Sequence, residues 1–203
     1  QFYFGVGYFN QQGIIDKSSY EKLTIKLNTT YQLTRRLKLG NNLTIAPHKE
    51  QIAPNVTYAA YRAQPVLEPY YPDGSFGVVY NVGNPLADLK YSNNYFKEIR
   101  GVGNFFAEAA LFQHFTLKSS FGLDAYYNKS VSFTPEFTVY NPDGTASQQQ
   151  NVGSDLYKGT GDFLGWLWEN TLSYNQTFGK HALDAVIGYT MQDNSSESYG
   201  ISG

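Results

Sequence analysis

The sequence is dominated by a strict alternation of apolar and polar residues that persists for 11 or more positions at a time. In residues 23–33, for example, Leu23 and Ile25 alternate with Thr24 and Lys26. Successive side chains of a β-strand point to opposite faces, whereas a helix places its apolar residues three or four positions apart. The pattern therefore predicts long strands that each have one apolar and one polar face.

The expected strands form hairpins. A short turn joins the two strands of each hairpin, whereas residues 11–19, 46–100 and 129–162 form much longer connections between hairpins. The seven expected strands cover residues 2–10, 23–33, 37–45, 101–111, 115–127, 164–174 and 183–191. Because short and long connections alternate along the chain, all the long loops would lie at one end of the sheet.

This asymmetry favours an all-β, antiparallel transmembrane barrel wall with long extracellular loops, because outer-membrane barrels combine short periplasmic turns with long external loops. The strands also exceed the five or six residues usual in globular sheets. We expect Leu23, Ile25, Leu27 and Leu39 to face outward, toward lipid. Asn41 and Asn170 fall on the same face, which predicts a bulge or a position above the membrane there. A soluble β-sandwich is the alternative fold.

The composition agrees with strands. Aromatic residues reach 17% and charged residues only 16%, below the roughly 25% of ordinary soluble domains. The mean hydropathy is -0.41 and no apolar run is long enough for a transmembrane helix, but a membrane strand needs only about 9–11 residues and shows lipid one face. The formal net charge is -2 and no basic cluster is present, so no nucleic-acid partner is expected.

The sequence does not predict an enzyme. Its candidate acids lie mostly at polar strand positions, where solvation or a basic neighbour accounts for them; they are Glu98, Glu108, Asp124, Glu169 and Asp184. No cysteine is present and the three histidines lack a ligand spacing, so neither a metal site nor a cofactor is predicted. The Pro-Asp-Gly sequences at 72–74 and 142–144 predict β-turns.

Several stretches, taken in order, resemble the barrel of SusC/RagA-type TonB-linked outer-membrane proteins. They are GYFNQQGIIDKSSYEKLTIKLNTTY, RRLKLGNNLTIA, AYRAQPVLEPYYPDGS, NVGNPLADL and ENTLSYNQTFGKHALDAVIGYTMQ, which together span nearly the whole chain. The resemblance implies a cell outer membrane protein with an N-terminal plug, a TonB box and a barrel of about 22 strands. Residues 1–203 are then expected to be an internal piece of that barrel, without the plug and the remaining strands.

The same resemblance implies TonB-dependent import of oligosaccharides or peptides. The implied partners are a SusD-like surface lipoprotein, the TonB complex acting through the plug, outer-membrane lipid, and the glycan or peptide substrate. A surface carbohydrate-binding β-sandwich module is the alternative function, and a glycan hydrolase ranks third.

Substrate contact is predicted in the long segment at residues 46–100, because aromatic rings flanked by amides and carboxylates bind sugars and peptides, and because loops on a rigid scaffold carry function. This segment is too long for a simple connector. The candidate residues are Tyr70, Tyr71, Asp73, Tyr80, Asn81 and Asn84.

Overall fold

A computed structural model describes all residues, 1–203, and contains one seven-stranded antiparallel sheet in the order β1-β2-β3-β4-β5-β8-β9. Its strands are β1 (Phe2–Gln12), β2 (Ser19–Thr34), β3 (Leu37–Ile52), β4 (Asn93–Ala110), β5 (Phe115–Thr134), β8 (Asp155–Phe178) and β9 (His181–Ser202). A separate hairpin pairs β6 (Phe137–Tyr140) with β7 (Ala146–Asn151), and two short helices, α1 (Thr57–Arg62) and α2 (Pro85–Tyr91), precede β4. Neither helix is long and apolar enough to cross a membrane.

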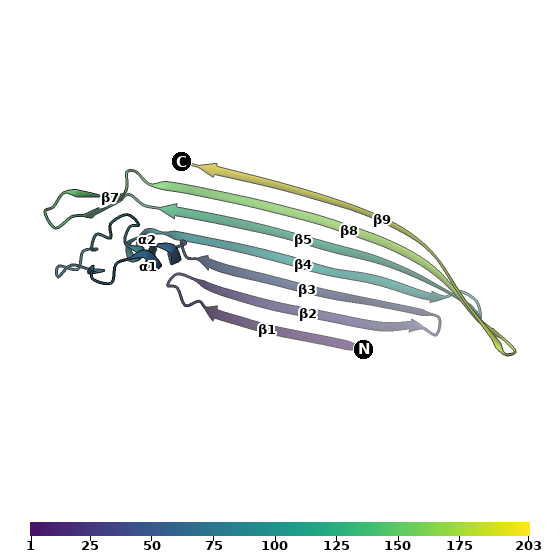
Figure 1. Cartoon of the computed structure of the whole chain (residues 1–203). Helices are drawn as coiled ribbons and strands as arrows, with labels where there is room; N and C mark the ends of the chain where they lie inside the picture. Colours follow the sequence, from purple (N-terminus) through teal and green to yellow (C-terminus); the bar gives the residue numbers. More distant parts are fainter.

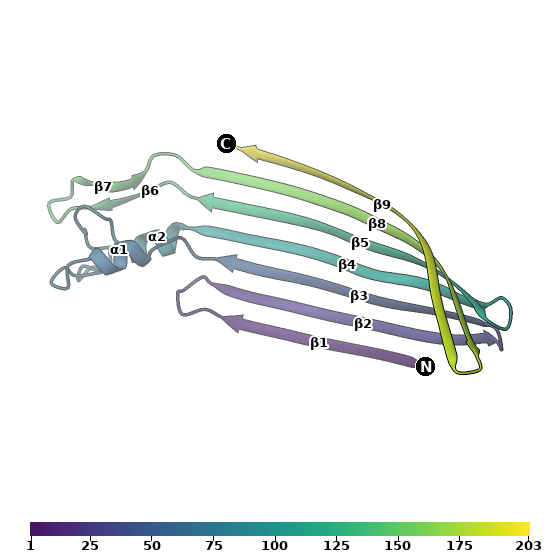
Figure 2. The same cartoon turned by 45° about the vertical axis from the view of Figure 1, so that its right-hand side comes forward.

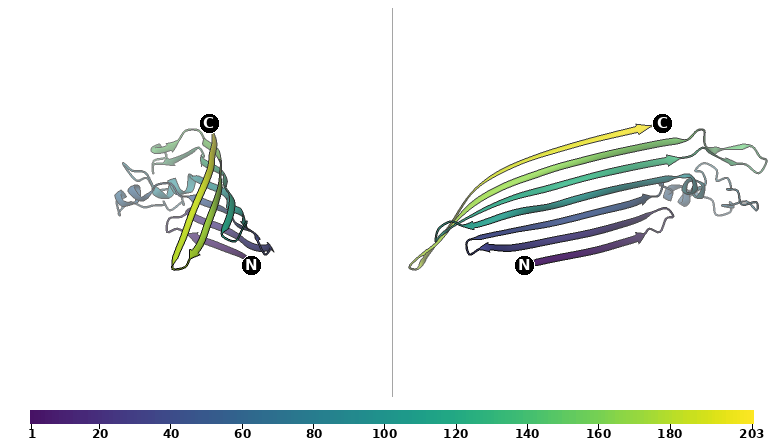
Figure 3. Two further views of the ribbon diagram at one scale, coloured as in Figure 1. Left: turned by 90° about the vertical axis from the view of Figure 1, so that its right-hand side faces the viewer. Right: turned by 180° about the vertical axis from the view of Figure 1, so that it is seen from behind.

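The strands of the main sheet run side by side as a simple meander, which twists along its length (Figures 1 and 2). The tight turns lie at one end, where the β8–β9 hairpin extends beyond its neighbours. The helices and the β6–β7 hairpin gather at the opposite end, which we call the loop end (Figure 3). β1 and β9 form the two edges of the sheet. The predicted count of seven strands and the segregation of long loops are thus confirmed.

The strand register separates an apolar face from a polar face. Leu27 lies opposite Leu43, and Leu43 lies opposite Gly103. The same row continues through Leu123 to Trp166. All four residues expected to face outward, Leu23, Ile25, Leu27 and Leu39, alternate onto this apolar face. The polar face carries the intervening side chains of the same strands.

No second layer covers either face of the main sheet, so the β-sandwich alternative is wrong. Only 12 of the 203 residues are buried, too few for a sandwich core. Most of the buried apolar side chains lie at the loop end, around α1, α2 and β6: Val56, Ala59, Val79, Ala87 and Val139. The exposed apolar face is thus marked as a contact surface for lipid or for another protein.

The strands extend further toward the loop end than the alternation predicted. β3 continues through Lys49 and Glu50 to Ile52, and β5 continues to Thr134. In the β3 extension both faces carry polar side chains, so the apolar-polar signal disappears although the hydrogen-bonded ladder continues. In the β5 extension Lys129 interrupts the apolar face, which then resumes with Val131 and Phe133. A strand of 16 to 24 residues also exceeds the about 9–11 residues that a tilted membrane strand requires.

No bulge removes Asn41 or Asn170 from the apolar face, so the expectation of a bulge is wrong, and a position above the membrane stays a prediction. The register is continuous through both residues. The side chain of Asn41 accepts a hydrogen bond from the Thr29 hydroxyl and donates to the Leu27 carbonyl oxygen at 3.2 Å. Its amide is therefore satisfied within the sheet. Nothing in the structure gives the Asn170 amide a partner.

Glycines concentrate on the polar face of the strands. They are Gly5, Gly7, Gly40, Gly122, Gly159, Gly161, Gly165, Gly188 and Gly200, whereas Gly101 and Gly103 lie on the apolar face. Neighbouring rings cover several of them: a Cβ on Gly40 would collide with the Phe106 ring. Small residues on one face let a sheet bend toward that face, and aromatic rings then shield the exposed backbone.

Paired substitutions on β2 test the assignment of the faces. In the intact protein, Leu27→Arg should impair barrel assembly because a charge at the middle of the apolar face costs about 2–4 kcal/mol in lipid. Asn28→Arg, one residue along on the polar face, should assemble normally. Heat-modifiable migration on gels and abundance in the outer membrane measure assembly, and equal behaviour of the two variants would contradict the assignment.

Candidate functional site

Two long segments of the chain pack together at the loop end of the sheet. A chain of aromatic contacts joins them: Tyr70 to Phe76 at 5.3 Å between ring centroids, Phe76 to Tyr91 at 5.8 Å, and Tyr91 to Phe137 at 4.4 Å. The last pair is stacked, with an interplanar angle of 9°. Since Phe137 begins β6 and the other three precede β4, these rings attach the β6–β7 hairpin to the segment between β3 and β4.

Asn84 organises this segment. Its side-chain oxygen accepts a hydrogen bond of 2.9 Å from the Leu86 amide and so caps α2, where Pro85 occupies the first turn. Its side-chain nitrogen donates to the carbonyl oxygens of Pro69 and Gly77, both at 2.8 Å. Asn84 is only 1% exposed, and its amide group is fully engaged in holding three parts of the loop together.

Gln149 of β7 reaches across to the same helix. Its side-chain oxygen accepts from the Asn84 backbone N–H at 2.7 Å, and its side-chain nitrogen donates to the Asn84 carbonyl at 3.0 Å and to Asp88 at 2.8 Å. Gly83 permits this approach, because its φ of +78° disfavours a larger residue and because a Cβ at this position would lie only 3.0 Å from the Gln149 side chain. One glutamine thus joins segments 65 residues apart in sequence.

Lys17, in the connection between β1 and β2, binds the other end of α2. Its ammonium group donates to the carbonyl oxygens of Lys90 at 2.7 Å and Ser92 at 2.8 Å. A cation at a helix C-terminus satisfies carbonyls that have no partner within the helix. Partial burial, and secondarily the nearby Lys90 charge, lower the pKa of Lys17.

The two Pro-Asp-Gly sequences form the predicted turns. Gly74 donates its backbone N–H to the Tyr71 carbonyl, with a φ of +83°, and Asp73 accepts from the Ser75 amide at 2.9 Å and from its hydroxyl at 2.7 Å. Asp143 makes the corresponding bonds to Thr145. The side-chain hydrogen bond from the hydroxyl of Ser75 or Thr145 lowers the pKa of each aspartate, so each carboxylate stays ionised to a lower pH than an unbonded aspartate would.

Between the two docked segments lies a cleft of about 540 Å³. Its polar lining includes Tyr80, Asn81, Asp88, Asn141, Gln148 and Gln149, and backbone from residues 78–83 forms one wall. Tyr80 is 61% exposed and offers a ring face beside these amides. The arrangement suits a ligand rich in hydroxyl or amide groups, because the lining supplies both hydrogen-bond donors and acceptors together with one aromatic surface.

The structure places the six predicted contact residues in different environments. Tyr80 and Asn81 line the cleft, and Asn81 has a φ of +69° at its rim. Tyr70, Tyr71 and Asp73 belong to the neighbouring turn, outside the cleft lining, and the Tyr71 hydroxyl accepts from the Val78 amide at 3.2 Å. Asn84, buried beneath the cleft, contributes to its shape.

The polar face of the main sheet carries a second arrangement of functional groups. It carries two ion pairs, Lys38 with Glu108 at 3.4 Å and Arg100 with Asp124 at 2.6 Å, and the His48 imidazole lies 4.0 Å from the Glu98 carboxylate. These contacts account for three of the five candidate acids, and Asp184 accepts from Asn175 at 2.5 Å. The pairing gives these four carboxylates structural roles on the polar surface.

A row of rings crosses four strands on the polar face, near the loop end. Phe9 contacts Tyr20 at 6.1 Å, Tyr20 contacts His48 at 5.4 Å, and His48 contacts Phe96 at 5.7 Å. Cross-strand aromatic pairs of this kind stabilise a sheet by up to about 1 kcal/mol each. They also present a continuous ring surface beside the charged groups of the same face.

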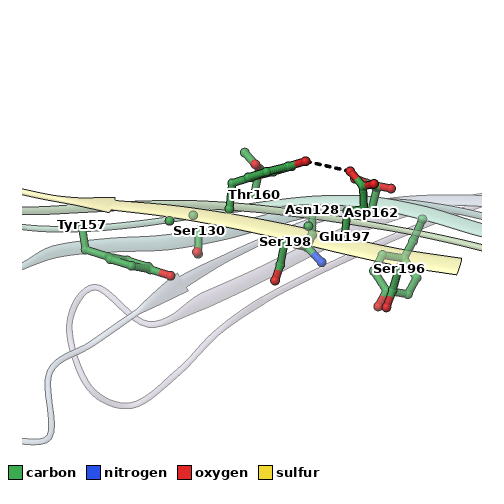
Figure 4. A pocket seen from close by; sticks show the side chains of 13 residues that line it. Asn128, Ser130, Tyr157, Thr160, Asp162, Ser196, Glu197 and Ser198 are labelled. Atoms are coloured by element: carbon green, nitrogen blue, oxygen red, sulfur yellow. Dashed lines mark hydrogen bonds between the residues drawn. The ribbon is translucent and has the colours of Figure 1, made fainter.

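A further cavity of about 430 Å³ lies where β5, β8 and β9 approach the loop end. Figure 4 shows Asn128, Ser130 and Tyr157 on one side of the sheet and Asp162 and Glu197 on the other. Tyr199 donates to Glu197 at 2.8 Å. The cavity therefore borders the β9 edge of the sheet and draws on both faces.

Sequence reasoning missed β6, β7 and Gln149. Residues 129–162 were expected to form one loop, because no apolar alternation marks the hairpin within it. The turn at residues 142–144 was predicted, and two strands flanking such a turn could have been inferred from it. The approach of Gln149 to Asn84 depends on tertiary packing and has no local sequence signal.

Comparison with curated proteins finds relatives over nearly the whole chain. TonB-dependent receptor P3 of Formosa agariphila is 27% identical over 214 aligned residues, which cover 97% of this chain and 20% of that protein. TonB-dependent receptor P26 of the same organism is 27% identical and covers 98% of this chain and 21% of the relative. The chain thus spans about a fifth of the length of these relatives. No model of a known protein family matches it.

Comparison with solved structures identifies known proteins that share the fold of this sheet. A chain in the structure of the RagAB peptide transporter matches 99% of this chain with a TM-score of 0.76 and 18% identity, over 23% of its own length. An open state of the RagAB peptide importer gives a TM-score of 0.75. The sheet therefore has the fold of a barrel-wall section from such a transporter, without closing into a barrel itself. The resemblance to TonB-linked proteins of the RagA type, predicted from sequence motifs, is confirmed.

Substitution of Asn84 tests the organisation of the loop. Asn84→Ala should remove the α2 cap, about 1 kcal/mol, and leave the buried Gly77 carbonyl unpaired at about 1–3 kcal/mol, whereas the Pro69 carbonyl keeps its bond from the Gly77 N–H. In the intact folded protein, limited proteolysis within residues 53–92 should accelerate at least about tenfold. Asn81→Gly, at an exposed position of positive φ, is the matched control and should leave cleavage unchanged. If Asn84→Ala and the parent resist proteolysis equally, Asn84 does not hold the loop together.

Proposed function

We propose that this chain forms part of the barrel wall of an outer-membrane, TonB-dependent importer. The similarity to TonB-dependent receptors over 97% of the chain carries this proposal. The uncovered apolar face supports it independently, because a long antiparallel sheet with an exposed apolar face is stable in lipid, where every main-chain group must be bonded internally. In this arrangement the apolar face contacts lipid and the polar face lines the barrel interior.

The proposed importer carries an oligosaccharide or a peptide. The cleft between the two docked loops supports this substrate class, since Tyr80, Asn81 and Gln148 can bind hydroxyl or amide groups without neutralising a strong charge. The rings and ion pairs of the polar face then lie along the path from the loops into the interior. A SusD-like surface lipoprotein is the proposed partner at the loop end, and the TonB complex acts from the other side through a plug.

Fractionation of the intact protein tests the proposal. It should be recovered in the outer membrane and be extracted only by detergent, and its reading frame should encode a plug domain and a signal peptide before residue 1. Uptake of a labelled peptide mixture or a labelled oligosaccharide mixture should stop in cells that lack TonB. Recovery as a soluble periplasmic monomer would reject the proposal.

Aromatic substitutions test the substrate contacts. Tyr80→Ala should lower uptake at subsaturating substrate by about two- to tenfold, because each ring contact is worth about 0.5–1.5 kcal/mol. The double change Tyr70→Ala with Tyr71→Ala should also lower uptake, because these residues form the turn beside the cleft and Tyr70 packs on Phe76. Tyr61→Ala is the matched control, since Tyr61 is 88% exposed in α1 and outside the cleft. Unchanged uptake with normal surface abundance would remove these residues from the substrate site and leave the importer assignment intact.

A further inference from the structure

Three lysines form a row across adjacent strands near the loop end. Lys49 of β3 lies directly opposite Lys97 of β4, and Lys97 lies directly opposite Lys129 of β5. All three side chains are exposed. They continue the alternation of the apolar face, because Pro47, Ile99 and Tyr127 form the preceding row of that face. The lysine row therefore lies near the loop-end margin of the apolar surface, and Tyr95 and Val131 follow it on the same side of the sheet.

The lysine row has no ion-pair partner within the chain. The two ion pairs of the structure and the His48–Glu98 contact all lie on the opposite, polar face. Glu21 lies opposite Lys49 in the register, and Asp162 lies opposite Tyr127, one step from Lys129, but neither carboxylate comes within 4.0 Å of a lysine nitrogen. The Lys97 ammonium instead lies 5.2 Å from the centre of the Tyr95 ring on its own face.

Like charges directly opposite each other destabilise a sheet unless an anion lies between them. Neighbouring strands are about 4.8 Å apart, so the row spans roughly 10 Å, a distance that a headgroup with two phosphates can cover. Lysine ammonium groups bind phosphate as compact charges with three donors each. A row of charges at the margin of the apolar surface, beside the Tyr95 and Tyr127 rings, matches the depth of lipid headgroups rather than that of the hydrocarbon.

We propose that Lys49, Lys97 and Lys129 bind the phosphate groups of a lipid headgroup in the outer leaflet of the membrane. The inference rests on the proposed function, which places the apolar face in lipid and the loop end outside the cell. The ligand is a lipid-borne phosphate rather than a free phosphate, because the site is open and shallow. The adjoining apolar rows would contact the acyl chains of the lipid, which a free phosphate lacks.

The test compares lipid retention in the intact protein. The triple variant Lys49→Gln, Lys97→Gln, Lys129→Gln is purified in detergent, and retained lipid A, a diphosphorylated glycolipid, is quantified by mass spectrometry. Retention should fall on the order of fivefold for each lysine removed, and the parent should lose the lipid in high salt. The triple change to Arg should retain it, because the positive charges remain.

A matched control removes the same number of charges from the polar face. The triple variant Lys22→Gln, Lys26→Gln, Lys118→Gln should retain lipid A as the parent does. Equal loss from both triple variants, or no loss from either, would overturn the lysine site. Inorganic phosphate at equal concentration should not displace lipid A; full displacement would assign the row to free phosphate and reject the lipid.

Membrane fractionation separates the two possible failures. If the parent and all variants reach the outer membrane but retain equal lipid, the lysine site is wrong and the importer assignment stands. If the parent is absent from the outer membrane, the importer assignment itself fails, whatever the lipid measurement gives.

Discussion

The antiparallel register, which shifts only at Gln32–Thr34 beside the β2–β3 turn, is the constraint on which the rest of the structure depends. Of the 130 backbone hydrogen bonds, 109 lie within helices and strands, so the main chain of the sheet is satisfied from strand to strand without a covering layer. In a hydrocarbon environment this internal pairing is the condition for stability, because an unpaired N–H or C=O has no water to bind. The register also fixes which side chains share a face, since a slip of one residue would exchange the two faces completely.

The register and the alternation together explain which parts of the fold were predictable. Leu23, Ile25 and Leu27 lie in a stretch where one face is apolar and the other polar, so their strand and their face could be inferred from sequence. The alternation fails beyond Pro47, where Lys49 and Glu50 make both faces polar, yet the strand continues to Ile52. Strand prediction thus ended where the apolar face ended, because burial rather than backbone geometry generates the sequence signal.

The candidate site could be predicted only where its contacts are local in sequence. The turns at Asp73 and Asp143 were predictable because their hydrogen bonds join residues two positions apart. The cleft was only partly predictable: Tyr80 and Asn81 were identified by residue type, but the opposite wall comes from β7, which is distant in sequence. Asn84 was predicted for its amide, and the structure instead uses that amide to hold the loop together. Residue chemistry alone does not distinguish a ligand contact from an internal one.

The hydrogen bonds of Gln149 have a mechanical consequence. Because its side chain bonds to both the Asn84 backbone and Asp88, the β6–β7 hairpin and α2 are tied at several points in addition to the stacked rings of Tyr91 and Phe137. A hinge motion of one segment would have to carry the other along, so the two loops would open or close as a single rigid flap. Lys17, in the β1–β2 connection, binds the far end of α2, and its hydrogen bonds to the Lys90 and Ser92 carbonyls would have to break before the two loops could move.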